Sequence, residues 1–369
     1  MDEPNSIKYP LLSIYAYITS GCNLNCRHCW IEPAFDGEKL PNEHFLDVEL
    51  FEKAITEAIP LGLSRIKFSG GEPLLHPQFD KLLAIVKDKK LSWTMESNLT
   101  VLSDDILNII ANGVRPKHIS TSIYSSIPEE HDKFTGVKGS FYRTIEGIRK
   151  LVKKDIHPQM IMSLHKDNVH QIESVVKLAE KEGCNSVKFN LIQPAGRSKS
   201  GNIPYLGGIS SQEILEKGNW VDTNLTKKVK IPLLFDLPAA FKPIKKILSG
   251  SAGRCNIKNI IGILADGSYA LCGIGYTVPD LIFGFISKDN LRDIWEEHPI
   301  IKDIRENLPE KLEGICRDCL FNYYCLGSCV AMNFHDTGSL FSSYRLCEIL
   351  NKKGLFPETR KRGNSRRIK

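Results

Sequence analysis

Hydrophobic residues follow two alternating patterns along the first 237 residues of the chain. Short apolar runs predict buried parallel strands at about 11–18, 65–69, 91–96, 117–123, 157–163 and 186–192. Apolar residues with the helical period predict amphipathic helices at about 47–59, 77–88, 103–112, 140–154 and 168–182. We expect Ser103 to cap the third helix, because two aspartates follow it. The six strand–helix units predict an α/β fold, a parallel sheet curled into a partial (β/α)6 barrel.

The rest of the chain has a different pattern. Residues 255–350 contain short apolar segments and many turns, which predict short strands and two helices. A seventh barrel strand is possible near 228–236. The expected organisation is a barrel domain at 1–237, a bridging segment at 238–254, a small cysteine-rich domain at 255–350 and a basic tail at 351–369.

Composition and charge narrow the class of protein. The 369 residues are 42% hydrophobic and 25% charged, and no apolar run reaches the ~18 residues that span a bilayer. Residues 1–9 show no signal-peptide pattern, so we expect a cytoplasmic protein without a membrane partner. The net charge of +6 resides in residues 360–369, which hold six basic side chains and no acidic one. We therefore expect no nucleic-acid partner, and the tail is either a solvated end or a contact for an acidic peptide or protein.

The chain has 11 cysteines, an odd number that argues against a fully disulfide-paired scaffold. Reduced thiols in a cytoplasmic protein usually bind metal or take part in catalysis. Three cysteines lie within residues 22–29 and seven within 255–347. Cys184 stands alone, and we expect it to be a small buried hydrophobic residue.

The first cysteine group, Cys22-Asn-Leu-Asn-Cys26-Arg-His-Cys29, directly follows the first predicted strand. In a barrel of this kind the chemistry lies in the loops after the strands. Three thiolates in one loop can bind three irons of a 4Fe–4S cluster and leave the fourth iron open. The alternative is a zinc site, although zinc prefers four closed ligands.

Further motifs lie at the ends of later strands. The second strand ends in Gly70-Gly71-Glu72-Pro73, where glycines permit close backbone approach and Glu72 can pair with an ammonium group. The third ends in Ser97-Asn98, the fourth in Ser122-Ile123-Tyr124 and the sixth in Pro194-Ala195-Gly196-Arg197.

In this order, the cysteine loop and the strand-end motifs resemble the radical SAM superfamily, whose partial barrel is TIM-like. The resemblance implies the cofactor S-adenosylmethionine (SAM) and a 4Fe–4S cluster on Cys22, Cys26 and Cys29. It implies that a 5′-deoxyadenosyl radical made from SAM removes a hydrogen atom from the substrate. The implied cofactor contacts are His28, Gly70, Gly71, Glu72, Pro73, Ser97, Asn98 and Ser122.

The second cysteine group resembles the SPASM domain, which holds two auxiliary iron–sulfur clusters. The resemblance assigns Cys316, Cys319, Cys325 and Cys347 to a distal cluster, and Cys255, Cys272 and Cys329 to a proximal one. Seven cysteines are one short of two complete sets, so the proximal cluster has an open iron or a ligand other than cysteine. Two zinc ribbons are the alternative for this region. Residues 291–295 resemble the short helix usual in the domain.

A narrower likeness covers nearly the whole chain. Segments at 13–19, 29–31, 281–284, 325–329 and 354–357 are similar to maturases that act on ribosomal precursor peptides with Nif-type leaders, a group that includes the spliceases. The likeness implies excision of tyramine from a tyrosine residue, which leaves an α-keto-β-amino acid. The alternatives are a cross-linking (thioether or carbon–carbon) or epimerising peptide maturase, a tetrapyrrole or quinone cofactor maturase, and, from another class, a zinc-binding scaffold protein.

The likeness also implies partners. We expect a precursor peptide with its leader and an electron donor such as flavodoxin or ferredoxin. The first strand begins near residue 10, which leaves no room for an N-terminal leader-binding domain, so we expect a separate small recognition protein. No catalytic acid or base is assigned. His157, His165 and Tyr276 are possible pocket residues, although a solvated or core role is expected for each.

Overall fold

The computed structural model describes residues 8–35, 44–113, 115–201, 203–250 and 253–363, and the ten strands in these ranges form one sheet. The strands are β1 Ser13–Tyr17, β2 Arg65–Ser69, β3 Ser92–Glu96, β4 His118–Ser122, β5 Gln159–Leu164, β6 Ser186–Leu191, β7 Leu233–Phe235, β8 Ile260–Ile263, β9 Ser268–Ala270 and β10 Ile282–Phe285. The first six lie within two residues of their predicted ends. The seventh is also present and is shorter than predicted.

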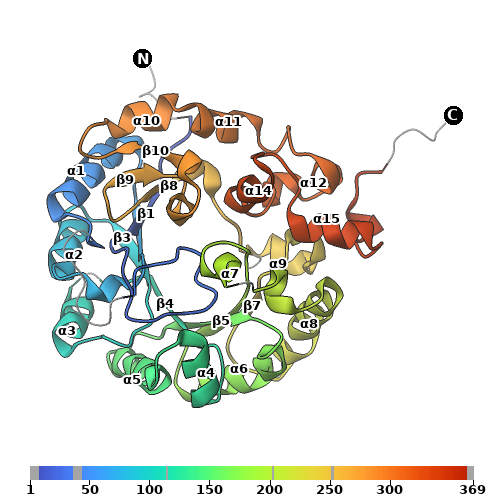
Figure 1. Ribbon diagram of the computed structural model, residues 1–369, viewed down its shortest axis with the longest axis horizontal. Helices are drawn as coiled ribbons and strands as arrows, with labels where there is room; N and C mark the ends of the chain where they lie inside the picture. Colours follow the sequence, from blue (N-terminus) through green and yellow to red (C-terminus); the bar gives the residue numbers. More distant parts are fainter. Residues whose placement is uncertain (1–7, 36–43, 114, 202, 251–252, 364–369) are drawn as a thin grey trace.

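The sheet has the curved, parallel arrangement that the sequence predicts. Its strand order is β10-β9-β8-β1-β2-β3-β4-β5-β6-β7, and all neighbours from β8 to β7 are parallel. Helices form a ring around the outside of the sheet (Figure 1). Because β7 and β10 are two free edges of one sheet, the barrel is partial, and the predicted fold class is confirmed.

The helices of the barrel lie between its strands. They are α1 Val48–Ala58, α2 Phe79–Asp88, α3 Asp104–Asn112, α4 Pro128–Thr135, α5 Ser140–Lys153, α6 Ile172–Lys181, α7 Arg197–Ser200, α8 Ser211–Thr223 and α9 Ile244–Leu248. Ser103 caps α3 as predicted, because its hydroxyl oxygen accepts a hydrogen bond from the Ile106 N–H at 3.2 Å. The sequence did not predict α4, a polar helix that buries only three side chains and so shows no clear hydrophobic period.

The auxiliary segment, residues 255–350, is more helical than predicted. Its helices are α10 Leu291–Glu297, α11 Pro299–Asn307, α12 Gly314–Asp318, α13 Asn322–Cys325, α14 Val330–Thr337 and α15 Arg345–Lys352. The prediction of two helices was wrong, because none of the six is longer than nine residues and such short helices show little period. The shortest, α12 and α13, have only five and four residues. The short helix expected at 291–295 is present as α10.

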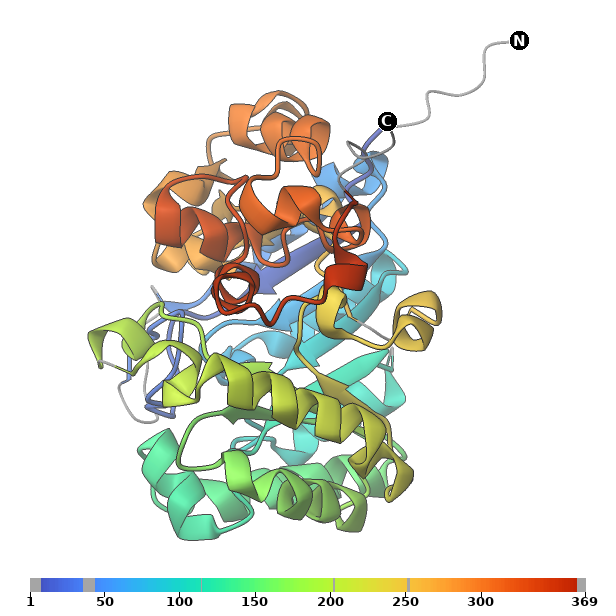
Figure 2. The ribbon, with the colours of Figure 1, turned by 90° about the vertical axis from the view of Figure 1, so that its right-hand side faces the viewer.

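The auxiliary segment completes the wall of the barrel on both sides. At one edge β8 pairs in parallel with β1, from Ser13 opposite Ile260 to Ala16 opposite Ile263. On the other side α15 packs against α8, and the Lys353 ammonium donates to the Ser211 hydroxyl at 3.1 Å. Figure 2 shows this side, with the auxiliary helices above α8. The segment 238–254 therefore joins two parts that share one sheet, while the domain boundaries themselves stay a prediction.

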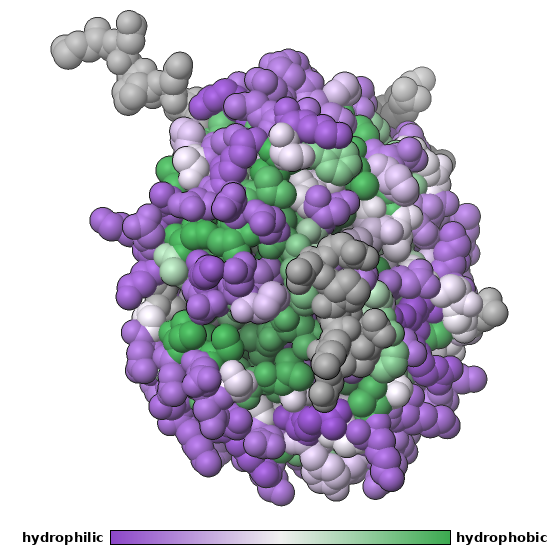
Figure 3. All heavy atoms as spheres, turned by 60° about the vertical axis from the view of Figure 1, so that its left-hand side comes forward, coloured by the Kyte–Doolittle hydropathy of each residue, from purple (hydrophilic) through white to green (hydrophobic). Residues whose placement is uncertain are grey.

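The surface is mostly hydrophilic. Figure 3 shows polar side chains over most of one face and apolar ones gathered near its centre. Most of the buried apolar residues form one large cluster that extends from Leu11 to Phe356, and two small clusters lie beside the cavity described below. None of the helices in the described ranges is both long enough and apolar enough to cross a membrane.

Candidate active site

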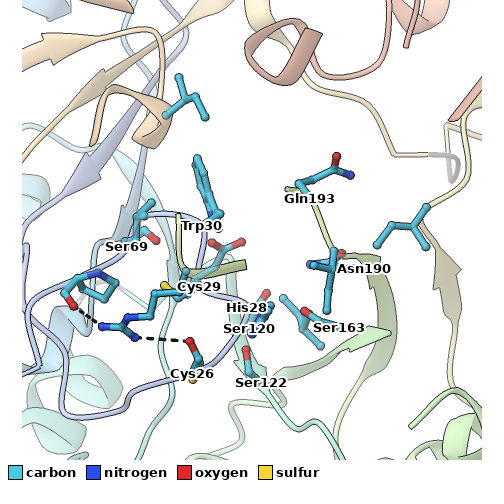
Figure 4. Close-up of a pocket in the computed structure, with 18 of the residues that line it drawn as sticks. Cys26, His28, Cys29, Trp30, Ser69, Ser120, Ser122, Ser163, Asn190 and Gln193 are labelled. Atoms are coloured by element: carbon cyan, nitrogen blue, oxygen red, sulfur yellow. Dashed lines mark hydrogen bonds between the residues drawn. The ribbon is translucent and has the colours of Figure 1, made fainter. Parts of the chain in front are cut away.

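A cavity of about 420 Å³ lies within the barrel, at the carboxyl ends of its strands. Its lining comes from the first cysteine loop, from the strand ends and from the auxiliary segment. The strand ends contribute the polar side chains Ser69, Glu96, Ser120, Ser122, Ser163, Lys188, Asn190 and Asp236. Figure 4 shows several of them around the cavity, with Ser163 and Asn190 across from the loop that carries Cys26 and Cys29. The strand-end motifs found in the sequence thus surround one space.

The first cysteine loop places all three of its thiols in the lining of this cavity. Backbone hydrogen bonds hold the loop against the end of α4, from the Asn25 N–H to the Thr135 carbonyl at 2.8 Å and from the Arg27 N–H to the Phe134 carbonyl at 3.1 Å. Burial raises the pKa of the Cys26 thiol to about 12. The metal-free loop therefore holds protons that a bound cluster would displace.

A second loop, after β6, clamps the cysteine loop from the other side of the barrel. The Arg197 N–H donates to the Cys29 carbonyl at 2.8 Å, and the guanidinium donates to the carbonyl oxygens of Cys26 and Pro33 (dashed lines in Figure 4). Gly196 has a φ of 54°, and a Cβ there would lie 2.5 Å from the Trp30 carbonyl oxygen. Only glycine permits this close approach of two backbones.

The Gly70-Gly71 loop packs on the backbone before Cys22 and also lines the cavity. A Cβ at Gly71 would lie 1.9 Å from the Gly21 carbonyl oxygen. The Gly71 N–H donates to the Thr19 carbonyl at 2.8 Å, and the Glu72 N–H donates to the Gly21 carbonyl at 2.9 Å. The two glycines therefore bring the ends of β1 and β2 into direct backbone contact.

Glu72 lies behind this loop and is fully buried. Its carboxylate accepts hydrogen bonds from the Ser97 hydroxyl and the Asn98 N–H, both at 2.7 Å, and from the Leu74 N–H at 3.1 Å. Burial raises the pKa of Glu72 to about 7, although these three donors oppose the rise. Glu72 and the buried Pro73 are outside the cavity lining, so the geometry favours a role in joining the β2 and β3 loops.

The other predicted cofactor contacts do line the cavity, namely His28, Gly70, Gly71, Ser97, Asn98 and Ser122. The Asn98 amide nitrogen lies 3.9 Å from the Cys22 sulfur and donates to the Asn23 side-chain oxygen at 2.9 Å. Burial lowers the pKa of His28 to about 3, so its ring is neutral. That ring packs on Tyr124 and Phe134 at centroid distances of 4.9 and 5.0 Å.

The auxiliary cysteines lie in two groups, while their assignment to two clusters stays a prediction. Cys316, Cys319, Cys325 and Cys347 line a small separate cavity of about 20 Å³. The Cys347 thiol hydrogen-bonds to Cys316 and lowers the pKa of Cys316 to about 7.

The remaining three, Cys255, Cys272 and Cys329, interact electrostatically with one another. Cys272 and Cys329 also line the main cavity, so its lining includes cysteines of the first loop and of the auxiliary segment.

The donors in each group are thiols. Within the described ranges, no three His, Cys, Asp or Glu side chains converge closely enough to hold one metal ion. Three or four thiolates are the donor set that an iron–sulfur cluster takes.

The remaining sequence candidates lie outside the main cavity. Cys184 is buried, as expected for a small hydrophobic residue. His157 is on the surface, and its ring nitrogen lies 2.8 Å from the Gly183 carbonyl. His165 stacks on Phe134 beside a separate cavity of about 170 Å³. The Tyr276 hydroxyl accepts from the Ala265 N–H at 3.1 Å.

Several lining residues were not found from the sequence. Tyr17 and Trp30 form an edge-to-face pair at 6.4 Å on the side of the cavity near Cys272. The side-chain oxygen of Asn190 is buried and has no hydrogen-bond partner in the described part of the chain. Asp236 lines the same cavity. For Tyr17, Asn190 and Asp236 the available signal was their position at or next to the ends of buried strands, which indicates a face but not the residues opposite it. Trp30 directly follows Cys29 in the first cysteine loop.

Comparisons with known proteins agree with this geometry. The family model described as Radical SAM superfamily matches residues 16–179, and the SPASM model, described as an iron-sulfur cluster-binding domain, matches residues 255–320. An AdoMet-dependent heme synthase from Methanosarcina barkeri is 27% identical over 89% of this chain and 94% of its own. A PqqA peptide cyclase from Ruegeria pomeroyi is 24% identical over 84% of this chain and 79% of its own.

The crystal structure of Streptococcus suis SuiB bound to precursor peptide SuiA shares the fold. The match covers 92% of this chain and 76% of the SuiB chain, with a TM-score of 0.71 and 16% sequence identity. Together with the family matches, the fold and the cysteine loop define the class: the protein is a radical SAM enzyme. More particularly, it is a radical SAM enzyme that carries a SPASM iron–sulfur domain after its barrel.

Proposed function

We propose that this enzyme modifies a ribosomally made precursor peptide, and that the reaction is excision of tyramine from a tyrosine residue of that peptide. The observation that carries the proposal is one cavity whose lining includes both the first cysteine loop and Cys272 and Cys329. Relatives named PqqA peptide cyclase and subtilosin biosynthesis protein AlbA, and the peptide-bound SuiB structure, support a peptide substrate.

The proposal includes SAM and three iron–sulfur clusters, and the donor sets of the chain fit them. Cys22, Cys26 and Cys29 would hold the first cluster, with Cys316, Cys319, Cys325 and Cys347 on the distal one. Cys255, Cys272 and Cys329 would hold the proximal one, whose fourth position is open or has a ligand other than cysteine. SAM on the first cluster supplies a carbon radical that abstracts hydrogen from the substrate.

The chain's own residues would orient SAM and the substrate and exclude water from them. The backbone of Gly70 and Gly71 and the side chain of Asn98 lie beside the first cysteine loop, where the cofactor is expected. The unpartnered Asn190 oxygen is a buried acceptor that needs a donor from a ligand. Trp30 and Tyr17 offer ring faces and edges to an aromatic side chain, which suits a tyrosine target.

The proposed partners are the precursor with its leader, a separate small leader-recognition protein, and an electron donor such as flavodoxin or ferredoxin. Relatives of this class act on precursor peptides by name, which supports the first partner. The other two, like a cytoplasmic location, stay predictions from the sequence.

Co-expression with a Tyr-Gly-containing precursor and its leader-binding partner tests the function. We expect mass spectrometry to show the loss of one tyramine unit from the precursor. Cys26→Ala should abolish the change and Cys184→Ala should preserve it, because Cys26 lines the cavity and Cys184 does not. A precursor of unchanged mass, with reconstituted clusters, SAM and reductant, would refute tyramine excision. Loss of two hydrogens instead would indicate cross-linking.

A tetrapyrrole substrate is the second candidate, because the heme synthase relative matches almost the whole chain. Incubation of the reconstituted enzyme with an iron porphyrin and SAM would test it. Turnover of the porphyrin, without any change in precursor peptides, would favour this candidate over the first.

A further inference from the structure

The C-terminal residues Glu358–Arg362, here called the strap, lie along the loop that follows Cys316. The Leu320 N–H donates to the Arg360 carbonyl at 2.8 Å, and the Arg362 N–H donates to the Asp318 carbonyl at 2.7 Å. Cys319 and Lys361 form an antiparallel bridge between these two contacts. The first residues of the basic segment 360–369 are therefore fixed on the distal cysteine loop instead of frayed, and of the two interpretations of the tail a fully solvated end is wrong for them.

The strap places two arginines, Arg360 and Arg362, next to this loop. The Arg360 guanidinium lies 5.0 Å from the centre of the Phe321 ring, and the Arg362 guanidinium donates to the Asn322 side-chain oxygen at 2.8 Å. In the described ranges neither arginine forms an ion pair with a carboxylate, whereas Lys361 pairs with Glu358 and Arg317 with Asp318. Both arginines act electrostatically on the Cys319 thiol. Two uncompensated positive charges thus lie beside a distal cysteine.

Exposed apolar side chains lie next to these charges. Leu320 is 53% exposed and Tyr323 is 64% exposed, although the neighbouring Cys319 is only 7% exposed. We define the distal face as Arg317, Leu320, Tyr323, Arg360, Lys361 and Arg362. Two of its four cations, Arg317 and Lys361, pair with carboxylates, and Arg360 and Arg362 do not in the described ranges. Exposed apolar side chains beside such arginines are typical of a surface that binds a partner transiently.

We propose that the distal face docks a small acidic electron-transfer protein, which exchanges one electron with the cluster held by the distal cysteines. The inference rests on the distal cluster of the proposed function. One electron leaves the reduced carrier and enters the oxidised cluster, and no bond or proton moves in this step. Charge complementarity selects the partner, because uncompensated arginines attract an acidic surface. The buried thiols of Cys319 and Cys316 lie one and four residues before Leu320, so the path of the electron from the distal face to the distal cluster is short.

The test measures binding to the reconstituted holoenzyme without oxygen, with a purified acidic flavodoxin as the probe. The variant is Arg360→Gln/Arg362→Gln, and the matched control is Arg143→Gln/Lys153→Gln, two exposed cations on α5. At low salt we expect the first pair to weaken binding by roughly three- to tenfold and the control pair to leave it unchanged. Circular dichroism and iron content must match the wild type.

If the variant misfolds, a second measurement on the wild type tests the inference instead. Hydrogen exchange at residues 317–323 and 358–362 should slow when flavodoxin is added, and should return to its free rate at high salt. Equal flavodoxin affinity of variant and wild type, or no change in exchange at these residues, would overturn the inference. Lost binding of an acidic leader peptide with unchanged flavodoxin binding would also overturn it, in favour of the leader. Absence of the distal cluster from the holoenzyme would instead overturn that part of the proposed function.

Discussion

The contact between Gly71 and Gly21 gives a prediction whose size follows from the geometry. In Gly71→Ala the new Cβ would lie 1.9 Å from the Gly21 carbonyl oxygen and 3.0 Å from the Cys22 nitrogen. Carbon and oxygen atoms approach to only about 3.3 Å even in close contacts, so the two backbones must separate by about 1.4 Å. No side-chain rotation relieves the clash, because both partners are backbone atoms.

The separation breaks two hydrogen bonds, from the Gly71 N–H to Thr19 and from the Glu72 N–H to Gly21. Each bond contributes about 1 kcal/mol, and overpacking adds about 1–3 kcal/mol. We therefore expect a loss of about 3–5 kcal/mol in the free energy of unfolding. At about 2 °C per kcal/mol, the Tm of the barrel should fall by roughly 6–10 °C.

Calorimetry and iron analysis of the anaerobically reconstituted protein check this prediction. Because the displaced backbone carries Cys22, Gly71→Ala should also contain less iron than the wild type. Gly363→Ala is the matched control, since that exposed glycine has no atom within 4 Å of the added Cβ and no left-handed φ. A Gly71→Ala protein with the wild-type Tm and full iron content would refute the argument that this contact positions the cysteine loop.

Three further predictions concern single side chains. Arg197→Ala should lower iron retention and alter the electron paramagnetic resonance spectrum of the first cluster, and Arg197→Lys should rescue it only in part, because one ammonium cannot reproduce the forked contact with Cys26 and Pro33. Burial lowers the pKa of His131 from 6.5 to about 4, so the unfolded chain takes up a proton that the folded chain resists as the pH falls from about 6.5 to 4. The free energy of unfolding of the wild type is therefore lower by about 2 kcal/mol at pH 5. In urea unfolding, the free energy of unfolding of His131→Asn should depend less on pH between pH 7 and 5 than that of the wild type. Cys184→Ala should keep the full iron content, whereas Cys347→Ala should lose the iron of one cluster; equal iron in both would contradict the division of the cysteines.

The sequence predicted the parts of this fold that repeat a short local pattern. The β1 and β2 strands are visible as apolar runs and the cysteines as spaced motifs, so neighbouring residues alone are enough to find both. The convergence of Asn190 and Asp236 on one cavity depends on how far the sheet curls, which no local pattern records. The clamp by Arg197 was visible only as a motif, since its partner carbonyls belong to a loop about 170 residues earlier in the chain.

The pairing of β8 with β1 changes how the auxiliary segment is understood. A separate domain would contribute clusters at a distance, but this segment also extends the barrel sheet and supplies part of the cavity lining through Cys272, Ile274 and Met332. Gly273 shows how tight the junction is, because a Cβ there would lie 2.4 Å from the Tyr17 ring. Removing the segment would therefore expose the β1 edge and the apolar side chains of the cavity together. The proposed substrate site thus belongs to both parts of the chain, and changes in either part should alter substrate binding as well as cluster content.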